Sequence, residues 1–115
     1  MVNSIEEIVP LMLDFRMERN WEQFHVPKEL ATAISIEASE LLELFLWKER
    51  ESTNQVKKDK RRMNLIIDEI ADILIYLLFL SYDLEIDLPL ALKQKMEKNA
   101  KKYPEEEYRG RYKAY

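Results

Sequence analysis

The sequence contains no cysteine, which excludes disulfide bonds and thiolate metal sites. It also holds only one glycine and four prolines among 115 residues. Because both residues interrupt helices and mark turns, their scarcity favours long helices over short, turn-linked strands. A chain of this length suffices for one domain. We therefore predict a single all-α domain over residues 1–115, in which about 103–115 form a partly ordered tail.

An excess of basic residues is also missing, since the formal net charge is −4. Proteins that bind a nucleic-acid duplex usually present a basic face, so nucleic acid is not expected as a partner. The most apolar stretch, Ile73 to Leu80, is far shorter than the ~20 residues that cross a membrane. The first ten residues do not resemble a signal peptide. These absences favour a cytoplasmic protein without a membrane partner.

Hydrophobic spacing predicts four helices, and hence a four-helix bundle-like subunit. Ser4 and Glu7 form a capping box at the start of the first helix. The others are expected from Pro27 to about Lys48, from about Arg61 to Tyr82, and from near Asp87–Pro89 to before Pro104, with residues 49–60 as a loop.

The third predicted helix is apolar on every side between Ile70 and Leu80. A helix of this kind is normally buried all round. Four helices of this length do not easily surround one of their own number. We therefore expect neighbouring copies of the chain to cover it, as a homodimer or a homotetramer.

Four acidic residues lie on or beside the apolar stripes of the second and third helices. With ~100° per residue, Glu37 and Glu40 share one stripe, and Glu69 and Asp72 share the other. Buried carboxylates must be protonated, paired with cations or bound to a metal. Arg62 is the main basic candidate near these stripes. Ordinary surface acids remain the alternative for any single residue, but two pairs on two apolar stripes argue against it.

Clustered carboxylate oxygens suit a hard cation such as Mg²⁺ or Mn²⁺. Four acids exceed the charge of one divalent ion, so there is room for a second ion and for a polyphosphate, and the number of ions stays open. A di-iron bundle would require Glu-x-x-His pairs. The one histidine, His25, lies outside both acidic pairs, which excludes a di-iron site of this kind.

Several blocks of the sequence, in order, carry a family resemblance. Glu37-Ala38-Ser39-Glu40, a 28-residue gap and Glu69-Ile70-Ala71-Asp72 resemble the E-x-x-E…E-x-x-D signature of the all-α MazG-like nucleoside triphosphate pyrophosphohydrolases. The stretches 19–25 (RNWEQFH), 43–47 (ELFLW), 72–77 (DILIYL) and 95–104, which holds Lys95-Met96, Asn99 and Lys102-Tyr103-Pro104, resemble the dCTP pyrophosphatase branch. The similarity covers roughly residues 3–110.

The resemblance implies Mg²⁺-dependent hydrolysis of a nucleoside triphosphate, with dCTP as the leading substrate, to the monophosphate and pyrophosphate. Glu37, Glu40, Glu69 and Asp72 would hold the metal, and Glu40 is our choice of general base. The base and sugar pocket would comprise Trp21, Glu22, Gln23, Phe24, His25, Trp47 and Tyr76.

Lys95, Asn99 and Lys102 lie on one helical face and are candidates for gripping the outer phosphates. A solvated basic face is an equal alternative for the two lysines. In the animal dCTP enzymes of this branch, a histidine occupies the position of Met12. The alternative is therefore an enzyme with looser base selectivity that also acts on dATP or modified nucleotides.

A non-catalytic helical adaptor is the competing function.

Overall fold

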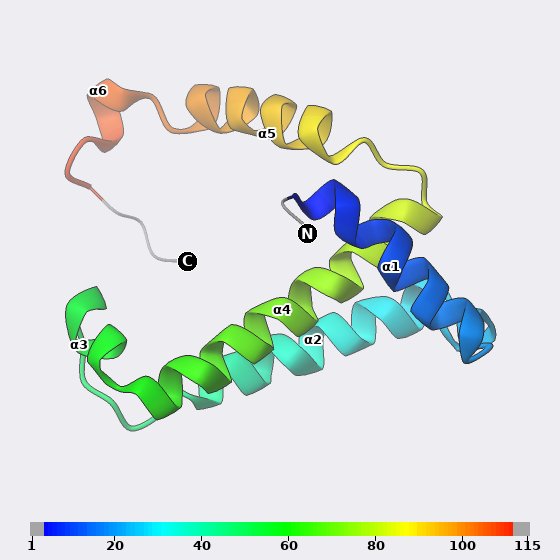
Figure 1. The fold of residues 1–115 in the computed structure, drawn as a ribbon. Helices are drawn as coiled ribbons and strands as arrows, with labels where there is room; N and C mark the ends of the chain where they lie inside the picture. Colours follow the sequence, from blue (N-terminus) through cyan, green and yellow to red (C-terminus); the bar gives the residue numbers. More distant parts are fainter. Residues whose placement is uncertain (1–3, 112–115) are drawn as a thin grey trace. The chain divides into compact units, whose positions relative to one another are not determined.

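A computed structural model describes residues 4–111, and every regular element in that range is a helix, which confirms the all-α class. The elements are α1 (Ile5–Glu18), the short 3₁₀ helix η1 (Glu22–Phe24), α2 (Pro27–Glu43), α3 (Thr53–Lys58), α4 (Lys60–Asp83), α5 (Leu88–Lys102) and α6 (Glu105–Tyr108) (Figure 1). The chain divides into two compact units, one ending at Asp83 and one beginning at Leu84, and each is described by itself.

The first helix is closed at both ends by local hydrogen bonds. The Ser4 hydroxyl accepts from the Glu7 backbone N–H, as the predicted cap requires. At the other end Trp21 donates its backbone N–H to Arg16, while Asn20 takes up a left-handed φ of 53°. This arrangement is a Schellman motif, in which asparagine is tolerated at the left-handed position. It turns the chain from α1 into η1.

The second helix is shorter than the sequence predicts. It begins at Pro27 as expected but ends at Glu43 rather than near Lys48. The reason is that the following backbone closes tighter turns, with Phe45 donating to Leu42, and that Trp47 adopts a φ of 62°. A residue in that left-handed conformation cannot continue a right-handed helix.

The stretch 49–60, predicted as a loop, contains the six-residue helix α3. Ser52 accepts from the backbone N–H of Gln55, and the Gln55 side chain accepts from that of Ser52. This complete capping box stabilises a helix in a stretch too polar to show hydrophobic spacing. The loop prediction is therefore wrong for residues 53–58.

The long helix α4 confirms its predicted bounds within one residue at each end. It packs lengthwise against α2, and α1 and α3 contact it as well (Figure 1). The buried apolar side chains of this first unit are Met12, Leu30, Ile66, Leu78 and Phe79. They come from α1, α2 and α4, so the core of the unit lies where these three helices meet.

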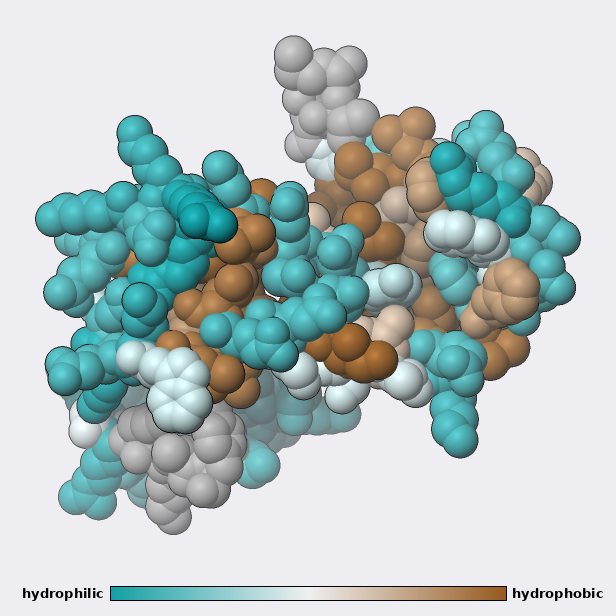
Figure 2. Space-filling view, turned by 90° about the horizontal axis from the view of Figure 1, so that it is seen from below, coloured by the Kyte–Doolittle hydropathy of each residue, from teal (hydrophilic) through white to brown (hydrophobic). Residues whose placement is uncertain are grey.

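Much of the apolar surface of α4 stays open in the single chain. The exposed apolar side chains on this helix include Leu65, Ile67, Ile70, Leu74 and Leu77, each 37–54% exposed. In Figure 2, brown apolar side chains reach the surface among teal charged ones. Helices α1, α2 and α3 therefore do not cover α4 completely, which is the situation that led us to expect an oligomer. None of the helices within 4–111 is long and apolar enough to cross a membrane.

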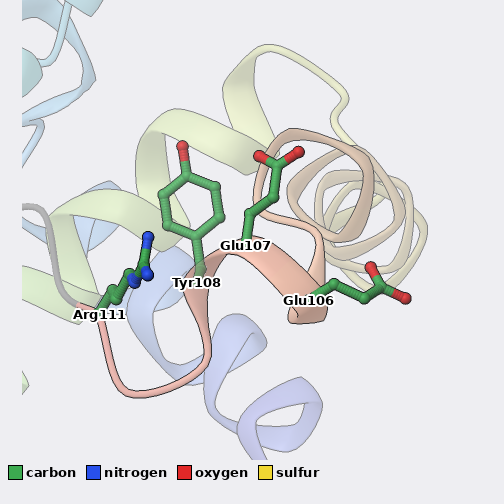
Figure 3. Close-up of a pocket in the computed structure, with 4 residues that line it drawn as sticks. All are labelled: Glu106, Glu107, Tyr108 and Arg111. Carbon is green, nitrogen blue, oxygen red and sulfur yellow. The ribbon is translucent and has the colours of Figure 1, made fainter.

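The second unit consists of α5 and α6. Helix α5 confirms the predicted fourth helix, and the Asp87 carboxylate caps it by accepting from the backbone N–H of Leu90. Beyond it, Tyr103 and Tyr108 pack edge to face with ring centroids 5.2 Å apart. Glu106, Glu107, Tyr108 and Arg111 surround an open hollow of about 440 Å³ (Figure 3). The predicted tail thus includes α6, while residues 112–115 lie outside the described range.

Candidate metal and nucleotide site

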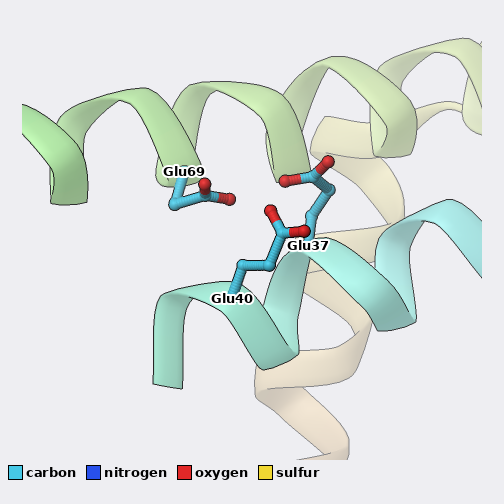
Figure 4. A group of neighbouring side chains, drawn as sticks. All are labelled: Glu37, Glu40 and Glu69. Atoms are coloured by element: carbon cyan, nitrogen blue, oxygen red, sulfur yellow. The ribbon is translucent and has the colours of Figure 1, made fainter. Parts of the chain in front are cut away.

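Three of the four predicted metal ligands come together between α2 and α4. Figure 4 shows Glu37 and Glu40 extending from α2 and Glu69 from α4, with their carboxylates gathered in the space between the helices. One oxygen from each lies within 4.8 Å of the other two. The i, i+3 spacing on α2 and the lengthwise packing of α2 on α4 produce this arrangement.

Among the described residues, the cluster has no cationic partner. One oxygen of Glu37 and one of Glu69 are buried, and neither has a hydrogen-bond partner in that part of the chain. Arg62, the basic residue that the sequence places nearest, instead makes a bidentate pair with Glu51 at 2.7 and 2.9 Å. Within residues 4–111, no lysine or arginine forms an ion pair with the three carboxylates. Buried carboxylate oxygens in this state favour protonation or a bound cation.

The pKa values of two of these groups move in the direction that crowding dictates. The neighbouring Glu69 carboxylate, followed by loss of hydration, raises the pKa of Glu37 above its ordinary value. The Glu37 carboxylate in turn raises the pKa of Glu40. Like charges held this close disfavour simultaneous ionisation. A divalent cation removes this repulsion, and unpartnered carboxylate oxygens are its preferred donors, so the residues fit such an ion.

Asp72, the fourth predicted ligand, lies one turn after Glu69 on α4 but outside the group within 4.8 Å. Its carboxylate is near enough to Glu37 to contribute to the raised pKa of that residue. Asp72 also lines an adjoining pocket. It therefore connects the acidic cluster to a space that can hold a ligand.

That pocket has a volume of about 360 Å³ and lies within the first unit. Its walls are mainly apolar and aromatic side chains from α1, α4 and the segment between α1 and α2. The lining residues are Leu11, Met12, Phe15, Trp21, His25, Asp72, Ile75, Tyr76 and Phe79. An apolar pocket with a few polar groups is typical of small-molecule sites.

The aromatic walls form a continuous series of ring contacts. Trp21 meets Phe15 edge-on at 5.7 Å and His25 at 6.4 Å between centroids. His25 in turn meets Tyr76 at 6.4 Å and Phe79 at 5.1 Å. Edge-to-face and tilted ring pairs of this kind hold one another in place. They present flat apolar faces on which a nucleobase can stack.

Two polar groups in the pocket have environments set by burial. Burial, and then the charge of Arg16, lower the pKa of His25, which favours the neutral form of its imidazole. Its Nδ1 atom is buried and has no hydrogen-bond partner within residues 4–111. Burial also raises the pKa of the Tyr76 phenol, with Glu37 and Asp72 adding to the effect. Tyr76 therefore lines the pocket and is also close enough to the acidic cluster for its phenol to respond to the charges there.

Of the predicted pocket residues, Trp21, His25 and Tyr76 line this pocket. Glu22, Gln23 and Phe24 lie in η1 outside its lining, and Phe24 is 61% exposed. Trp47 lies in the turn after α2 and is 99% exposed. The roles of these four residues in substrate binding remain predictions.

The three predicted phosphate contacts all lie on α5, in the second unit. Asn99 is half-buried and its carbonyl accepts from the backbone of Tyr103. Lys95 and Lys102 are exposed, and the Lys102 ammonium lies 5.3 Å from the centroid of the Tyr103 ring. Their contact with phosphate remains a prediction.

Sequence reasoning did not single out Phe15, Ile75 or Phe79 as pocket residues. Phe15 belongs to the apolar stripe of α1, and the other two lie in the apolar stretch of α4. Such residues look like core in a sequence, because a pocket wall and a core position share the same hydrophobic spacing. Met12 did stand out, because the resemblance marked it as a departure.

Comparison with known proteins agrees with these features. The family model described as "MazG-like family" matches residues 32–115, which include α2 from residue 32 onward, the acidic cluster and α4. Curated relatives include dCTP pyrophosphatase 1 of Bos taurus, which is 40% identical over 107 residues, and that of Mus musculus, which is 42% identical over 108. The alignment covers 93% of this chain and 63% of each relative, so the chain spans less than two thirds of their length.

A solved structure resembles the chain along nearly its whole length. The crystal structure of a pyrophosphatase from Archaeoglobus fulgidus DSM 4304 superposes with a TM-score of 0.78 and 46% identity. The match covers 90% of this chain and 95% of the archaeal one. The helical architecture is therefore shared with a solved protein of nearly the same extent.

Proposed function

The chain belongs to the MazG-like family, and on that premise we propose that it is a Mg²⁺-dependent nucleoside triphosphate pyrophosphohydrolase acting on dCTP. The observation that carries this proposal is the Glu37–Glu40–Glu69 cluster, in which two buried oxygens lack a partner among the described residues. The adjoining aromatic pocket supports it. The names of the curated relatives, dCTP pyrophosphatase 1, support the choice of substrate.

In this proposal Glu37, Glu40, Glu69 and Asp72 hold the metal. When bound, Mg²⁺ supplies positive charge against the phosphate oxygens and offsets the charge that develops there. Glu40 is our choice of general base, and it would accept the proton of the attacking water on a carboxylate oxygen that does not bind the metal. The oxygen of water forms a bond to one of the two phosphorus atoms that flank the α–β bridging oxygen, and the bond from that phosphorus to the bridging oxygen breaks. The products are the nucleoside monophosphate and pyrophosphate.

The aromatic pocket binds the base and sugar of the substrate. Trp21 and Phe15 offer stacking faces, each worth ~1–3 kcal/mol per base. The unpartnered Nδ1 of His25 and the Tyr76 phenol offer hydrogen bonds. As the resemblance implies, Lys95, Asn99 and Lys102 are our candidates for contacts with the outer phosphates. Glu22, Gln23 and Phe24 are our candidates for further contacts with the nucleoside.

We further propose that the functional form is a homodimer or homotetramer that covers the exposed apolar face of α4. Exposed residues such as Ile67 and Ile70 place apolar surface of this helix in water, which is unfavourable and is relieved when another chain covers it. Within one chain Trp47 lies outside the pocket, so its part in the nucleoside site depends on this assembly. Ile67→Asp with Ile70→Asp is expected to lower the mass found by light scattering, and an unchanged mass contradicts the proposal.

The test of the activity is incubation with dCTP and Mg²⁺ and separation of the products. Equal amounts of dCMP and pyrophosphate are expected. Release of orthophosphate contradicts cleavage between the α- and β-phosphates. Faster cleavage of dATP, dUTP or a modified nucleotide in a parallel screen favours the broader specificity. No turnover of any nucleotide, together with no Mg²⁺-induced thermal shift, favours the helical adaptor.

A further inference from the structure

We propose that the ion pair of Arg16 and Asp83 is a positioning device for the nucleoside pocket, which it holds in shape through the ring of Phe79. This inference rests on the proposed function, since the ligand of the pocket is taken to be a nucleoside. Arg16 lies on α1 and Asp83 is the last residue of α4. Neither residue lines the pocket.

The pair has an unusual location for charged groups. The Arg16 side chain is only 7% exposed and that of Asp83 is 26% exposed. Both terminal nitrogens of Arg16 donate to the Asp83 carboxylate at 2.9 Å. Replacing a buried ion pair by apolar residues of similar size is often neutral or stabilising. Stability alone is therefore a weak reason for this pair, and its geometry needs another explanation.

The geometry connects the pair to the pocket. The Arg16 guanidinium carbon lies 4.6 Å from the centroid of the Phe79 ring. The His25 ring lies 5.1 Å from Phe79, and both rings line the pocket. Phe79 is 4% exposed, so it has little freedom to move except by displacing these neighbours. The two hydrogen bonds to Asp83 hold the Arg16 guanidinium in one orientation. The guanidinium restricts the rotation of the Phe79 ring, and the Phe79 ring restricts the position of the His25 ring.

The consequence extends along the remaining rings. His25 also contacts Tyr76 and Trp21. A rotation of Phe79 therefore changes the surface that a base meets, although Arg16 never touches the base. The two parallel hydrogen bonds between Arg16 and Asp83 resist rotation of the guanidinium, whereas a single apolar contact at this place would not. We expect loss of the pair to weaken nucleoside binding and to leave the phosphate and metal chemistry unaffected.

The test is the double variant Arg16→Leu with Asp83→Leu, which removes both charges and leaves no buried charge unpaired. The expected result is a KM for dCTP raised about 10-fold, with kcat within about 2-fold of the wild type. The inhibition constant of inorganic tripolyphosphate, which has no base, should be unchanged. Phe79→Leu should raise KM to a similar extent, and combining it with the double variant should add little, because the three residues act through one route.

A matched control is available in the other buried pair, Arg62 with Glu51, whose residues do not line the pocket. Arg62→Leu with Glu51→Leu should leave the KM for dCTP unchanged. An unchanged KM in the Arg16–Asp83 variant, or a tripolyphosphate constant that shifts as much as KM, overturns the positioning role while the activity stands.

Binding of dCMP measured by isothermal titration calorimetry separates this inference from the proposed function. A wild-type chain that binds dCMP but cleaves no nucleotide overturns the proposed function alone. In that case about 10-fold weaker dCMP binding in the variant still supports the positioning role. A wild-type chain that neither binds dCMP nor cleaves any nucleotide overturns both.

Discussion

Glu37 on α2 and Glu69 on α4 approach each other across the helix interface, and each keeps one buried oxygen that no group in the described part of the chain hydrogen-bonds. The two side chains therefore oppose the packing of the helices that carry them. In the absence of a cation, this repulsion lowers the stability of the first unit. In the presence of one, the same oxygens become ligands.

Mg²⁺ is therefore expected to raise the melting temperature of the protein. An ion that binds the folded chain at 100 times its dissociation constant adds ~2.7 kcal/mol to the free energy of unfolding. For a domain of this size, that corresponds to a rise of about 10 °C or more. Differential scanning fluorimetry with Mg²⁺ and with EDTA measures the shift. Equal melting temperatures in the two conditions would remove the argument for a metal site.

The variants Glu37→Gln and Glu69→Gln are expected to lower kcat about 100-fold or more. Each removes a charged ligand and keeps nearly the same side-chain volume, and every tenfold in rate corresponds to ~1.4 kcal/mol. Product formation from dCTP measures the rate, and light scattering checks that the mass of the assembly is unchanged. Glu43→Gln, on an exposed position of α2, is the matched control. Near-wild-type rates in both test variants would contradict the ligand assignment.

The raised pKa of Glu37 gives the metal-free protein a particular pH dependence. A carboxyl with a raised folded-state pKa contributes stability below its ordinary value of 4.5, and this contribution is lost as the pH rises through the raised pKa. In EDTA at pH 7, Glu37→Gln should therefore melt about 3 °C above the wild type. The difference should vanish near pH 4. A gain of the same size at both pH values would show that repulsion is not its cause.

The pair of Arg62 and Glu51 has the opposite pH dependence. Hydrogen bonds from Arg62 lower the pKa of Glu51, so the pair contributes stability above the ordinary value of about 4.5 and loses it as the pH falls through the lowered pKa. Glu51→Gln should melt about 5 °C below the wild type at pH 7. Because the pairing charge is absent from the variant, this difference should shrink below pH 4. Thermal melts from pH 3 to pH 7 provide the comparison.

Met12→His is expected to narrow the selectivity for bases. Met12 is buried and lines the aromatic pocket, where a histidine would add one hydrogen-bonding group. A net hydrogen bond is worth ~0.5–1.5 kcal/mol, so the ratio of kcat/KM for dCTP over dATP should rise roughly 3- to 10-fold. Met12→Leu conserves volume without adding a polar group and is the control. An equal ratio in the two variants would indicate that this position does not read the base.

The sequence predicted the parts of the molecule that depend on periodicity. The bounds of α4 followed from the helical spacing of its apolar residues, and the meeting of Glu37 with Glu69 followed from acids on two apolar stripes. Helix α3 was not predicted, because a capping box stabilises it and it has no hydrophobic spacing to indicate a helix. The premature end of α2 depends on the backbone conformation of Trp47, which an aromatic residue does not usually adopt.

The pocket was predictable only in part. Trp21, His25 and Tyr76 came from the resemblance, whereas Phe15 and Phe79 are indistinguishable from core residues in a hydrophobic pattern. The pair of Arg16 and Asp83 joins positions 67 residues apart. No local pattern connects them, because a contact of this kind arises only when α1 and α4 pack.

The exposed ring of Trp47 has a practical consequence. The chain contains two tryptophans, and in the single chain Trp47 is 99% exposed while Trp21 lines the pocket. An indole in water emits at longer wavelength than one that has lost its hydration. Trp47 is thus an intrinsic optical probe whose emission should shift to the blue when anything covers the turn after α2. Replacing Trp21 by Phe would leave Trp47 as the single tryptophan. The emission wavelength measured during dilution would then report the dissociation of the assembly without an added label.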